Sequence, residues 1–324
     1  MIRHRTYKAL ALTLLIFIFS ASLFVVQRRG IPFVTKREQW TIGIIRGKTP
    51  FSFTSPLNYF NPVFRAEQVT DITAKFVADP FLMKEGKYWY LFFEAYNNIT
   101  KQGDLAVATS TNTWKWNYEQ VILDEPFHLS YPYVFKWQDD YYLIPESYET
   151  ESIRLYKADT FPTQWSFVST LVDGKDFVDN SIVYFNGMWW LFASTTSNDT
   201  LYLFFSDHLL GPWIEHPESP IVKENNHIAR SSGRLLIYED KLYRYAMDVN
   251  PPVGTHQVVA FKIADITPSS YYEERIGEEP VLQASGNGWK RQAMHQIDPL
   301  QLDPGHWIAA VDGFGEYLLF GWDY

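Results

Sequence analysis

The sequence predicts an all-β protein, a five-bladed β-propeller, and three observations lead to this prediction. Hairpin signals, in which two β-rich runs flank an acidic, Asn or Gly turn, recur at intervals of about 50 residues. That interval is typical of a propeller blade of four strands. Aromatic residues make up 18% of the chain, and helical periodicity is missing after residue 26. The 324 residues include no cysteine, which excludes a disulfide framework and a thiolate metal site.

Each predicted blade begins with one of these hairpins. The first runs from Asp79 to Glu94 around a turn at 85–87. The other four begin and end, in chain order, at Tyr131 and Glu146, Asp179 and Ser194, Gly233 and Asp248, and Asp298 and Asp312. A third strand follows each of the first four hairpins, and an aromatic residue introduces the fourth strand, namely Trp114, Trp165, Trp213 and Tyr272. We expect the three tryptophans to pack between blades.

The outer strands of the fifth blade are expected from the other end of the chain. The hairpin at 298–312 lacks a full third and fourth strand behind it, whereas 40–45 has the pattern of a strand. The tetrapeptide 61–64 resembles 219–222 and 279–282, which follow the third strands of two other blades. The N-terminal strands should therefore close the last blade, because closure removes an open sheet edge. The predicted propeller spans 40–324.

A different segment precedes the propeller. Residues 9–26 are almost continuously apolar and have basic residues on both sides. Eighteen helical residues extend ~27 Å, close to the ~30 Å hydrocarbon core of a bilayer. We therefore predict a cytosolic tail and a signal-anchor transmembrane helix in 1–29, followed by a linker in 30–39. A signal peptide cleaved near 20–22 is the alternative.

The orientation of such an anchor follows from its short tail. A tail of this length stays in the cytosol as a rule, which places the propeller on the lumenal or extracytoplasmic side. The sequons at Asn98 and Asn198 are compatible with a secretory lumen.

The charge and the short motifs exclude several classes of function. The chain has 28 Lys and Arg against 37 Asp and Glu, a formal net charge of −9, which argues against a nucleic-acid partner. A glycine-rich phosphate loop, His-x-x-x-His metal spacing and a Gly-x-Ser-x-Gly motif are all missing from the sequence. We therefore predict no cofactor and no metal.

The repeat predicts where a site would lie. In a propeller blade the first strand begins, and the second strand ends, at the same end of the axis. The candidates for catalysis there are Asp79, Asp179, Glu146 and Glu94. The candidates for ligand binding are Tyr131, Arg230, Asp248, His295, Asp298 and Asp312. A ring of carboxylates with a few aromatic residues fits a polyhydroxylated ligand. The alternative is structural: a repeated strand-end acid often binds the backbone amides of its own loop.

Several motifs also resemble those of a known family. The resemblance rests on 76–81 with 91–94, 129–134 with 144–147, 209–213 with 216–217, and 307–313. In this order they resemble the N-terminal β-propeller of plant glucosamine inositolphosphorylceramide transferases and their bacterial relatives. The resemblance implies a five-bladed propeller that stands, in the plant proteins, before an exostosin-like glycosyltransferase domain. This chain ends at Tyr324 without such a domain, so a separate glycosyltransferase is an expected partner.

A more distant similarity links the predicted fold to the five-bladed furanosidase clan of glycoside hydrolases. That similarity implies catalytic roles for Asp79 and Asp179. The clan's Glu general acid has no match at the first-strand starts of the third and fourth blades, which leaves Glu94 or Glu146 for that role.

Three functional hypotheses follow. The first is a membrane-anchored propeller, held through 9–26, that binds a glycan or glycolipid head group in sugar transfer or recognition. The alternative is a glycoside hydrolase with paired carboxylates. A purely structural or protein-interaction propeller is the third reading.

Overall fold

The computed structural model describes residues 13, 15–16, 19–20, 34–53 and 61–320. The chain forms two compact units, one of Gln39–Gly315 and one that combines Met1–Glu38 with Glu316–Tyr324. Most of the predicted signal-anchor segment 9–26, the alternative cleavage site and much of the linker 30–39 lie outside the described residues. Within the described residues, no helix has the length and apolarity needed to cross a bilayer.

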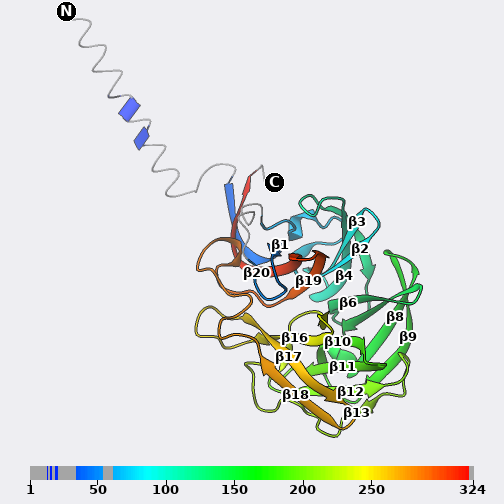
Figure 1. Cartoon of the computed structure of the whole chain (residues 1–324). Coiled ribbons are helices and arrows are strands. Elements are labelled where there is room, and N and C mark those ends of the chain that lie inside the picture. The colour runs from blue at the N-terminus through cyan, green and yellow to red at the C-terminus, as the bar shows by residue number, and fades with distance from the viewer. Residues whose placement is uncertain (1–12, 14, 17–18, 21–33, 54–60, 321–324) are drawn as a thin grey trace, which may run out of the picture. The chain divides into compact units, whose positions relative to one another are not determined.

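Five antiparallel sheets surround a central axis in the larger unit (Figure 1). The first sheet has the order β2 (Ala74–Glu85), β3 (Tyr88–Asn97), β4 (Gln102–Ser110) and β5 (Asn117–Leu123). The second has β6 (Ser130–Trp137), β7 (Asp140–Glu146), β8 (Ser152–Thr160) and β9 (Gln164–Asp173). The third has β10 (Phe177–Phe185), β11 (Met188–Thr195), β12 (Leu201–Ser206) and β13 (Ile214–Glu215). The predicted five-bladed propeller is thus confirmed for the first three blades.

The fourth blade has a divided inner strand. Two short strands, β14 (Arg230–Ser231) and β15 (Leu236–Tyr238), both pair with β16 (Lys241–Asp248). The sheet continues through β17 (Gln257–Thr267) to β18 (Ser270–Arg275). Within the described residues, three short 3-10 helices lie between strands, namely η2 (Ala66–Gln68), η3 (Tyr148–Thr150) and η4 (Gly288–Lys290).

The N-terminal strand closes the fifth blade, as predicted. Its sheet has the order β19 (Ile297–Asp303), β20 (His306–Phe320) and β1 (Val34–Gly47). Ile42 of β1 pairs with Phe64 through backbone hydrogen bonds of 3.0 and 3.2 Å. The same pairing joins Leu201 to Val222 and Val258 to Leu282 in the third and fourth blades. The repeated tetrapeptides therefore mark the outer edge of three blades.

Aromatic side chains fill the spaces between neighbouring blades. Phe92 of the first blade lies 6.1 Å from Trp165 of the second, between ring centroids, and Phe161 packs against both. Burial of such rings stabilises the fold by about 25 cal/mol for each Å² of apolar surface that is removed from water. The predicted packing role of Trp165 is confirmed. In the first blade Trp116 is the buried tryptophan. Trp114 is half-buried and lies beneath the guanidinium of Arg46 from β1 of the fifth blade, which is also a contact between blades.

Candidate functional site

The inner strands of the first three blades share a local distortion where they begin. A β-bulge interrupts the register after Ala78, Ser130 and Val178. The next residues, Asp79, Tyr131 and Asp179, have left-handed backbone with φ of 52°, 46° and 50°. Left-handed backbone is uncommon for residues other than glycine and tends to occur at functional sites. The bulge turns these three residues out of the ladder at one end of the axis.

The fourth and fifth blades have a different register from the one predicted. Arg230 pairs with Met247 and Ile297 pairs with Val311, so these two residues occupy the position that Asp79 has in the first blade. The predicted strand starts, Gly233 and Asp298, lie further along their strands and were wrong. The cause is that neither blade has the two-residue bulge of the first three, and the fourth has a longer interruption between β14 and β15.

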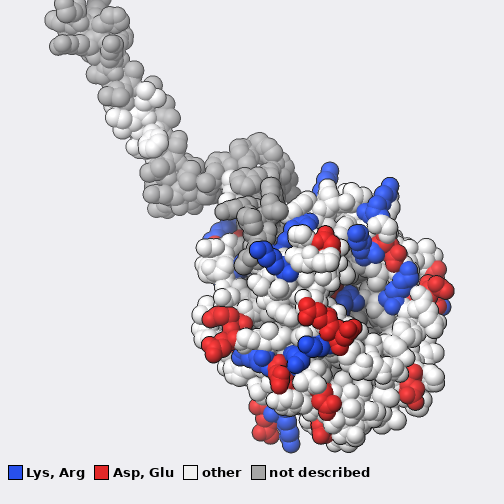
Figure 2. Space-filling model, in the orientation of Figure 1, with Lys and Arg blue, Asp and Glu red and all other residues white. Residues whose placement is uncertain are grey.

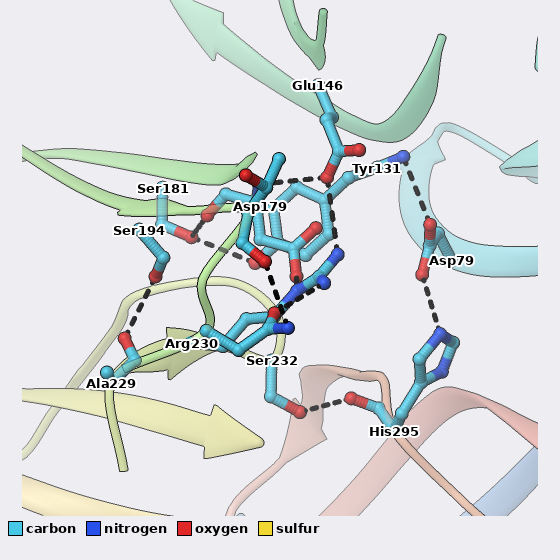
Figure 3. Close-up of polar contacts among 12 residues, drawn as sticks. Asp79, Tyr131, Glu146, Asp179, Ser181, Ser194, Ala229, Arg230, Ser232 and His295 are labelled. Carbon is cyan, nitrogen blue, oxygen red and sulfur yellow. Dashed lines mark hydrogen bonds and ion pairs between the residues drawn. The ribbon is translucent and has the colours of Figure 1, made fainter. Parts of the chain in front are cut away.

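Arg230 holds two of the predicted catalytic acids. Its Nε donates to Asp179 Oδ2 at 2.5 Å, and its Nη2 donates to Glu146 Oε2 at 3.4 Å. Its Nη1 donates to Asn198 Oδ1 at 2.8 Å. Figure 3 shows the guanidinium between the carboxyls of Glu146 and Asp179. The positive charge of Arg230 opposes the rise that burial causes in the pKa of Glu146.

His295 connects two other predicted site residues. Its Nδ1 lies 2.7 Å from Asp312 Oδ2, and its Nε2 lies 3.5 Å from Asp79 Oδ1. Figure 3 shows the His295 ring pointing toward Asp79 from the fifth blade. Trp40 of β1 stacks on the imidazole ring of His295, with ring centroids 4.2 Å apart. The structure thus brings Asp79, Asp179, Glu146, Arg230, His295 and Asp312 together.

Several of the acids also link one blade to the next. Asp312 accepts the backbone N–H of Asp79 at 3.1 Å, and Asp79 accepts that of Tyr131 at 3.3 Å. Glu146 accepts the N–H of Asp179 at 3.3 Å. These bonds join blades five to one, one to two and two to three. The structural reading of the repeated acids therefore has support, although the amides belong mostly to the neighbouring blade.

Glu94 and Asp248 lie beside histidines. Glu94 is buried, and its Oε1 lies 3.8 Å from His128 Nε2. Asp248 Oδ1 lies 2.9 Å from His227 Nδ1, and Asp248 Oδ2 accepts a hydrogen bond from Gln257 Nε2 at 3.0 Å. Asp248 also accepts the N–H of its own loop at residue 250. Both acids thus have local partners.

Tyr131 and Asp298 are buried rather than open to a ligand. The Tyr131 hydroxyl donates to the carbonyl of Gly233 at 2.9 Å and accepts its N–H at 2.8 Å. Asp298 pairs with Arg234, with Nε 2.8 Å from Oδ1, and accepts the N–H of Leu82 at 2.6 Å. Burial places both side chains among the groups that join blades.

Burial changes the pKa of several groups in the site. It raises the pKa of Asp79 to about 7, although His295 opposes the rise. It also raises the pKa of Glu94 and Glu146 well above the usual range, and nearby carboxylates add to the effect. Burial alone would lower the pKa of His295, but the carboxylates of Asp312 and Asp79 outweigh it and raise that pKa to about 9. His295 is therefore an imidazolium at neutral pH.

One group in the described part of the chain has the composition of a cation site. Asp79, His295 and Asp312 each offer a ligand atom, all within 4.8 Å of one another. The carboxylates of Asp312 and Asp79 raise the pKa of His295, and the three residues form an ion-paired set in this structure.

Sequence reasoning missed some residues of the site. Asn198 was considered only as a sequon, and Arg234 only as part of a strand start. Trp40 was assigned to the closing strand without a role in the site. His256, whose ring centroid lies 6.0 Å from that of His295, carried no signal at all. The one usable signal was position, since Trp40 lies in the strand predicted to pair beside the last hairpin.

The fold defines the class of protein, a five-bladed propeller shared with glycoside hydrolases. A glycosyl hydrolase from Bacteroides ovatus has a TM-score of 0.60 and 10% identity, with 78% of this chain and 91% of that chain covered. The catalytic domain of an α-L-arabinofuranosidase from Coprinopsis cinerea has a TM-score of 0.56 and 13% identity, with 82% and 85% covered. At these identities the likeness concerns the fold.

Sequence comparison identifies the family. The profile described as "Glucosamine inositolphosphorylceramide transferase 1, N-terminal" matches residues 35–314, and the chain belongs to this family. It is 36% identical over 298 residues to glucosamine inositolphosphorylceramide transferase 1 of Oryza sativa subsp. japonica, which covers 85% of this chain and 40% of that protein. The protein of the same name from Arabidopsis thaliana is 33% identical, with 85% and 39% covered. The chain thus spans about 40% of the length of these relatives.

Proposed function

We propose that this protein is a membrane-anchored propeller that binds a glycan or a glycolipid head group and acts in glycosyl transfer with a separate glycosyltransferase. One observation carries the proposal: a member of this family gathers paired acids, Arg230 and His295 at one end of its axis. The relatives' name joins glucosamine to a ceramide lipid. A saccharide, free or attached to a lipid, is therefore the ligand we propose for this cluster.

The anchoring part of the proposal rests on the apolar segment 9–26. With a cytosolic tail, it places the propeller on the lumenal or extracytoplasmic side. Fractionation with protease protection of the full chain tests this part: the propeller should be protected in sealed vesicles of that orientation. Digestion of the propeller in intact, correctly oriented vesicles would contradict it.

Glycan binding is tested with the full chain in detergent, against immobilised glycans and glycolipids. We expect a restricted set to bind, and the variants Asp79→Asn and Glu146→Gln to weaken binding about tenfold, since each replaces one acceptor oxygen of the site by an amide nitrogen. The matched control is Asp139→Asn, an exposed acid in the turn at the opposite end of β6. Unchanged binding in both site variants would reject this site.

A glycoside hydrolase is the second candidate, because burial keeps carboxyls of this site protonated near neutral pH. A pKa of about 7 for Asp79 and a raised pKa for Glu146 suit a general acid. Against it, the fourth blade has Arg230 at its strand start, and a guanidinium gives up no proton at neutral pH. We therefore rank binding above hydrolysis.

Hydrolysis is tested by measuring the release of reducing sugar from the same glycans. If the chain is a hydrolase, Glu146→Gln should lower turnover at least about 100-fold, the scale of general acid catalysis, while Asp139→Asn should not. If the unmodified protein releases no reducing sugar from the glycans, the result supports the binding role.

A further inference from the structure

Two acids of the first blade lie together outside the ion-paired cluster of the axial site. β4 and β5 are antiparallel neighbours, and the last paired residues at one end of their ladder are Leu105 and Leu123. Asp104 precedes Leu105 and Asp124 follows Leu123, so the two carboxyls meet where the ladder ends. Like charges opposite each other on neighbouring strands are destabilising, so this pair needs a compensating charge.

The carboxyl of Asp104 is buried and only half satisfied. Asp104 is 1% exposed, whereas Asp124 is exposed. Asn97 Nδ2 donates to Asp104 Oδ2 at 3.1 Å. The other oxygen, Oδ1, has no hydrogen-bond donor among the described residues. A buried acceptor without a donor is costly and uncommon in native proteins. The polypeptide thus leaves one oxygen of this carboxyl for a ligand.

The charge of the pair is not neutralised by a side chain. Burial raises the pKa of Asp104 to about 6, the amide of Asn97 opposes the rise, and the nearby carboxylate of Asp124 adds to it. Neither acid forms an ion pair within the described part of the chain. Lys101, a basic residue close in sequence, donates instead to Asn98 Oδ1 at 2.9 Å. At neutral pH the pair therefore carries an uncompensated negative charge.

The available ligand atoms fit a hard divalent cation. Both side chains offer carboxylate oxygens, which Ca²⁺ and Mg²⁺ prefer, whereas Zn²⁺ and Cu²⁺ favour imidazole or thiolate. The imidazole of His128 has its Nδ1 engaged by the backbone N–H of Gly103 at 2.9 Å. Because Asp124 is exposed, water can supply the remaining ligands. Ca²⁺ accepts an irregular set of this kind, whereas Mg²⁺ demands a near-ideal octahedron.

The axial group of Asp79, His295 and Asp312 differs from this pair in one respect. There the ring of His295 lies 2.7 Å from Asp312 Oδ2 and 3.5 Å from Asp79 Oδ1, and it supplies the positive charge itself. Asp104 and Asp124 have no such cation among the described residues. Their compensating charge has to come from solution.

The pair stands at the joint between the first and second blades. The connection from β5 to β6 begins at Asp124 and is held to the start of β4 by backbone contacts. Leu129 N–H donates to the carbonyl of Gly103 at 3.0 Å. A Cβ on Gly103 would lie 2.3 Å from the carbonyl oxygen of Leu129, so the connection packs directly on this strand. An ion held by both acids would fasten the same joint.

We propose that Asp104 and Asp124 bind a calcium ion, with Asp104 Oδ1 and the carboxylate of Asp124 as the protein ligands and water as the others. The ion joins the start of β4 to the β5–β6 connection and so stabilises the contact between the first two blades. This inference goes beyond the proposed function and does not depend on it, because neither acid belongs to the proposed glycan site.

Thermal melts of the full chain in detergent test the proposal. The protein is first stripped with EGTA, and CaCl₂, MgCl₂ or KCl is then added at matched ionic strength. A site of this kind has a Kd on the order of 1 mM or below, so 10 mM Ca²⁺ should raise the melting temperature by about 2–4 °C. Mg²⁺ should have a smaller effect and K⁺ none. Titration calorimetry with Ca²⁺ should give one site per chain.

Variants separate a bound ion from a merely structural role. In Asp104→Asn the amide oxygen can still accept from Asn97, while the amide nitrogen can donate to Asp124. Without calcium this variant should be at least as stable as the unmodified protein, and calcium should no longer raise its melting temperature. Asp124→Asn, at an exposed position, should also lose the calcium response and serves if Asp104→Asn does not fold. The matched control Asp139→Asn, in an exposed turn, should keep the full response.

Three results would overturn the inference. A calcium response retained in both Asp104→Asn and Asp124→Asn would mean that the ion binds elsewhere. An equal response to calcium and magnesium would exclude the calcium preference. No calcium response in the unmodified protein, with Asp104→Asn the more stable above about pH 6, would assign a shared proton in place of the ion. Glycan binding is measured separately, and none of these results decides it.

Discussion

Arg230 and His295 show how single side chains stabilise a buried cluster of acids. Each contacts two carboxyls, Arg230 those of Asp179 and Glu146, and His295 those of Asp79 and Asp312. An uncompensated buried charge costs several kcal/mol, so neither cation can be removed without consequence. The same contacts hold the cations at the surface of the site, where a ligand can reach them.

The pH dependence of stability should identify His295. Its pKa is about 9 in the folded protein against 6.5 unperturbed, so folding retains a proton between these values. Its contribution, on the order of 3 kcal/mol, is complete below pH 6.5 and is lost as the pH rises through 9. Urea unfolding at pH 6.5 and 9.5 should show this loss in the unmodified protein and a flatter dependence in His295→Gln.

The control for that experiment is His306→Gln, because His306 is exposed in the last hairpin turn. Asp79 acts in the same direction at lower pH, since its raised pKa makes stability fall between pH 3.8 and about 7. Parallel curves for the unmodified protein and His295→Gln above pH 7 would show that His295 does not retain its proton.

The strands show which part of the site depends on local geometry. Asp79, Tyr131 and Asp179 share one bulge and one backbone conformation, although their side chains differ. The conformation is therefore a property of the repeated strand start and not of the side chain. Gly233 has another constraint: a Cβ there would lie 1.7 Å from the carbonyl oxygen of Ile297, so only glycine allows this approach to the fifth blade.

The closing strand β1 should be required for a stable fold. Ile42 is fully buried in it and pairs with Phe64 at the outer edge of the fifth blade. Ile42→Ala should lower the free energy of unfolding by roughly 2–5 kcal/mol, because it leaves a cavity in a packed core. Arg37→Ala, at an exposed position of the same strand, should change it by less than about 0.5 kcal/mol. Urea titrations of both variants measure the difference, and equal values would exclude a closing role for β1.

Across the whole molecule, four blades meet at Arg234. This residue of the fourth blade pairs with Asp298 of the fifth and donates to the carbonyls of Val134 and Leu82 in the second and first blades. Its guanidinium also lies 5.1 Å from the ring centroid of Tyr133. Acidic and basic side chains elsewhere are interspersed over the visible face of the molecule (Figure 2). The contacts of Arg234 are instead gathered at the axis.

Removal of one partner of the axial pair should destabilise all blades together. Arg234→Met leaves Asp298 buried and unpaired, so we expect a loss of roughly 3–5 kcal/mol in a single cooperative transition. The double variant Arg234→Met with Asp298→Asn should regain part of that loss, because no unpaired charge is left. Calorimetry measures both. A double variant less stable than Arg234→Met would mean that Asp298 is held by contacts other than this pair.

Much of the fold was predictable because each blade repeats a local pattern. Alternating aromatic strands and short turns predicted the blade order, and the tetrapeptide at 61–64 predicted closure by the N-terminal strand. Six of the ten predicted site residues do lie together, in two ion-paired groups around Arg230 and His295. The register of the fourth and fifth blades was missed, because their inner strands lack the two-residue bulge of the first three blades.

The sequence by itself determined the number of blades, their closure and the family, since these depend on short-range pattern and on motifs in order. Only the tertiary structure decided which acid meets which cation. Arg230 contacts Glu146 across 84 positions of sequence, and Arg234 contacts Leu82 across 152. The tertiary structure also decided that Arg230 and His295 are more exposed than the carboxyls of Asp179 and Asp312 that they contact. Burial and ion pairing are properties of atoms brought together by folding, and no local pattern encodes them.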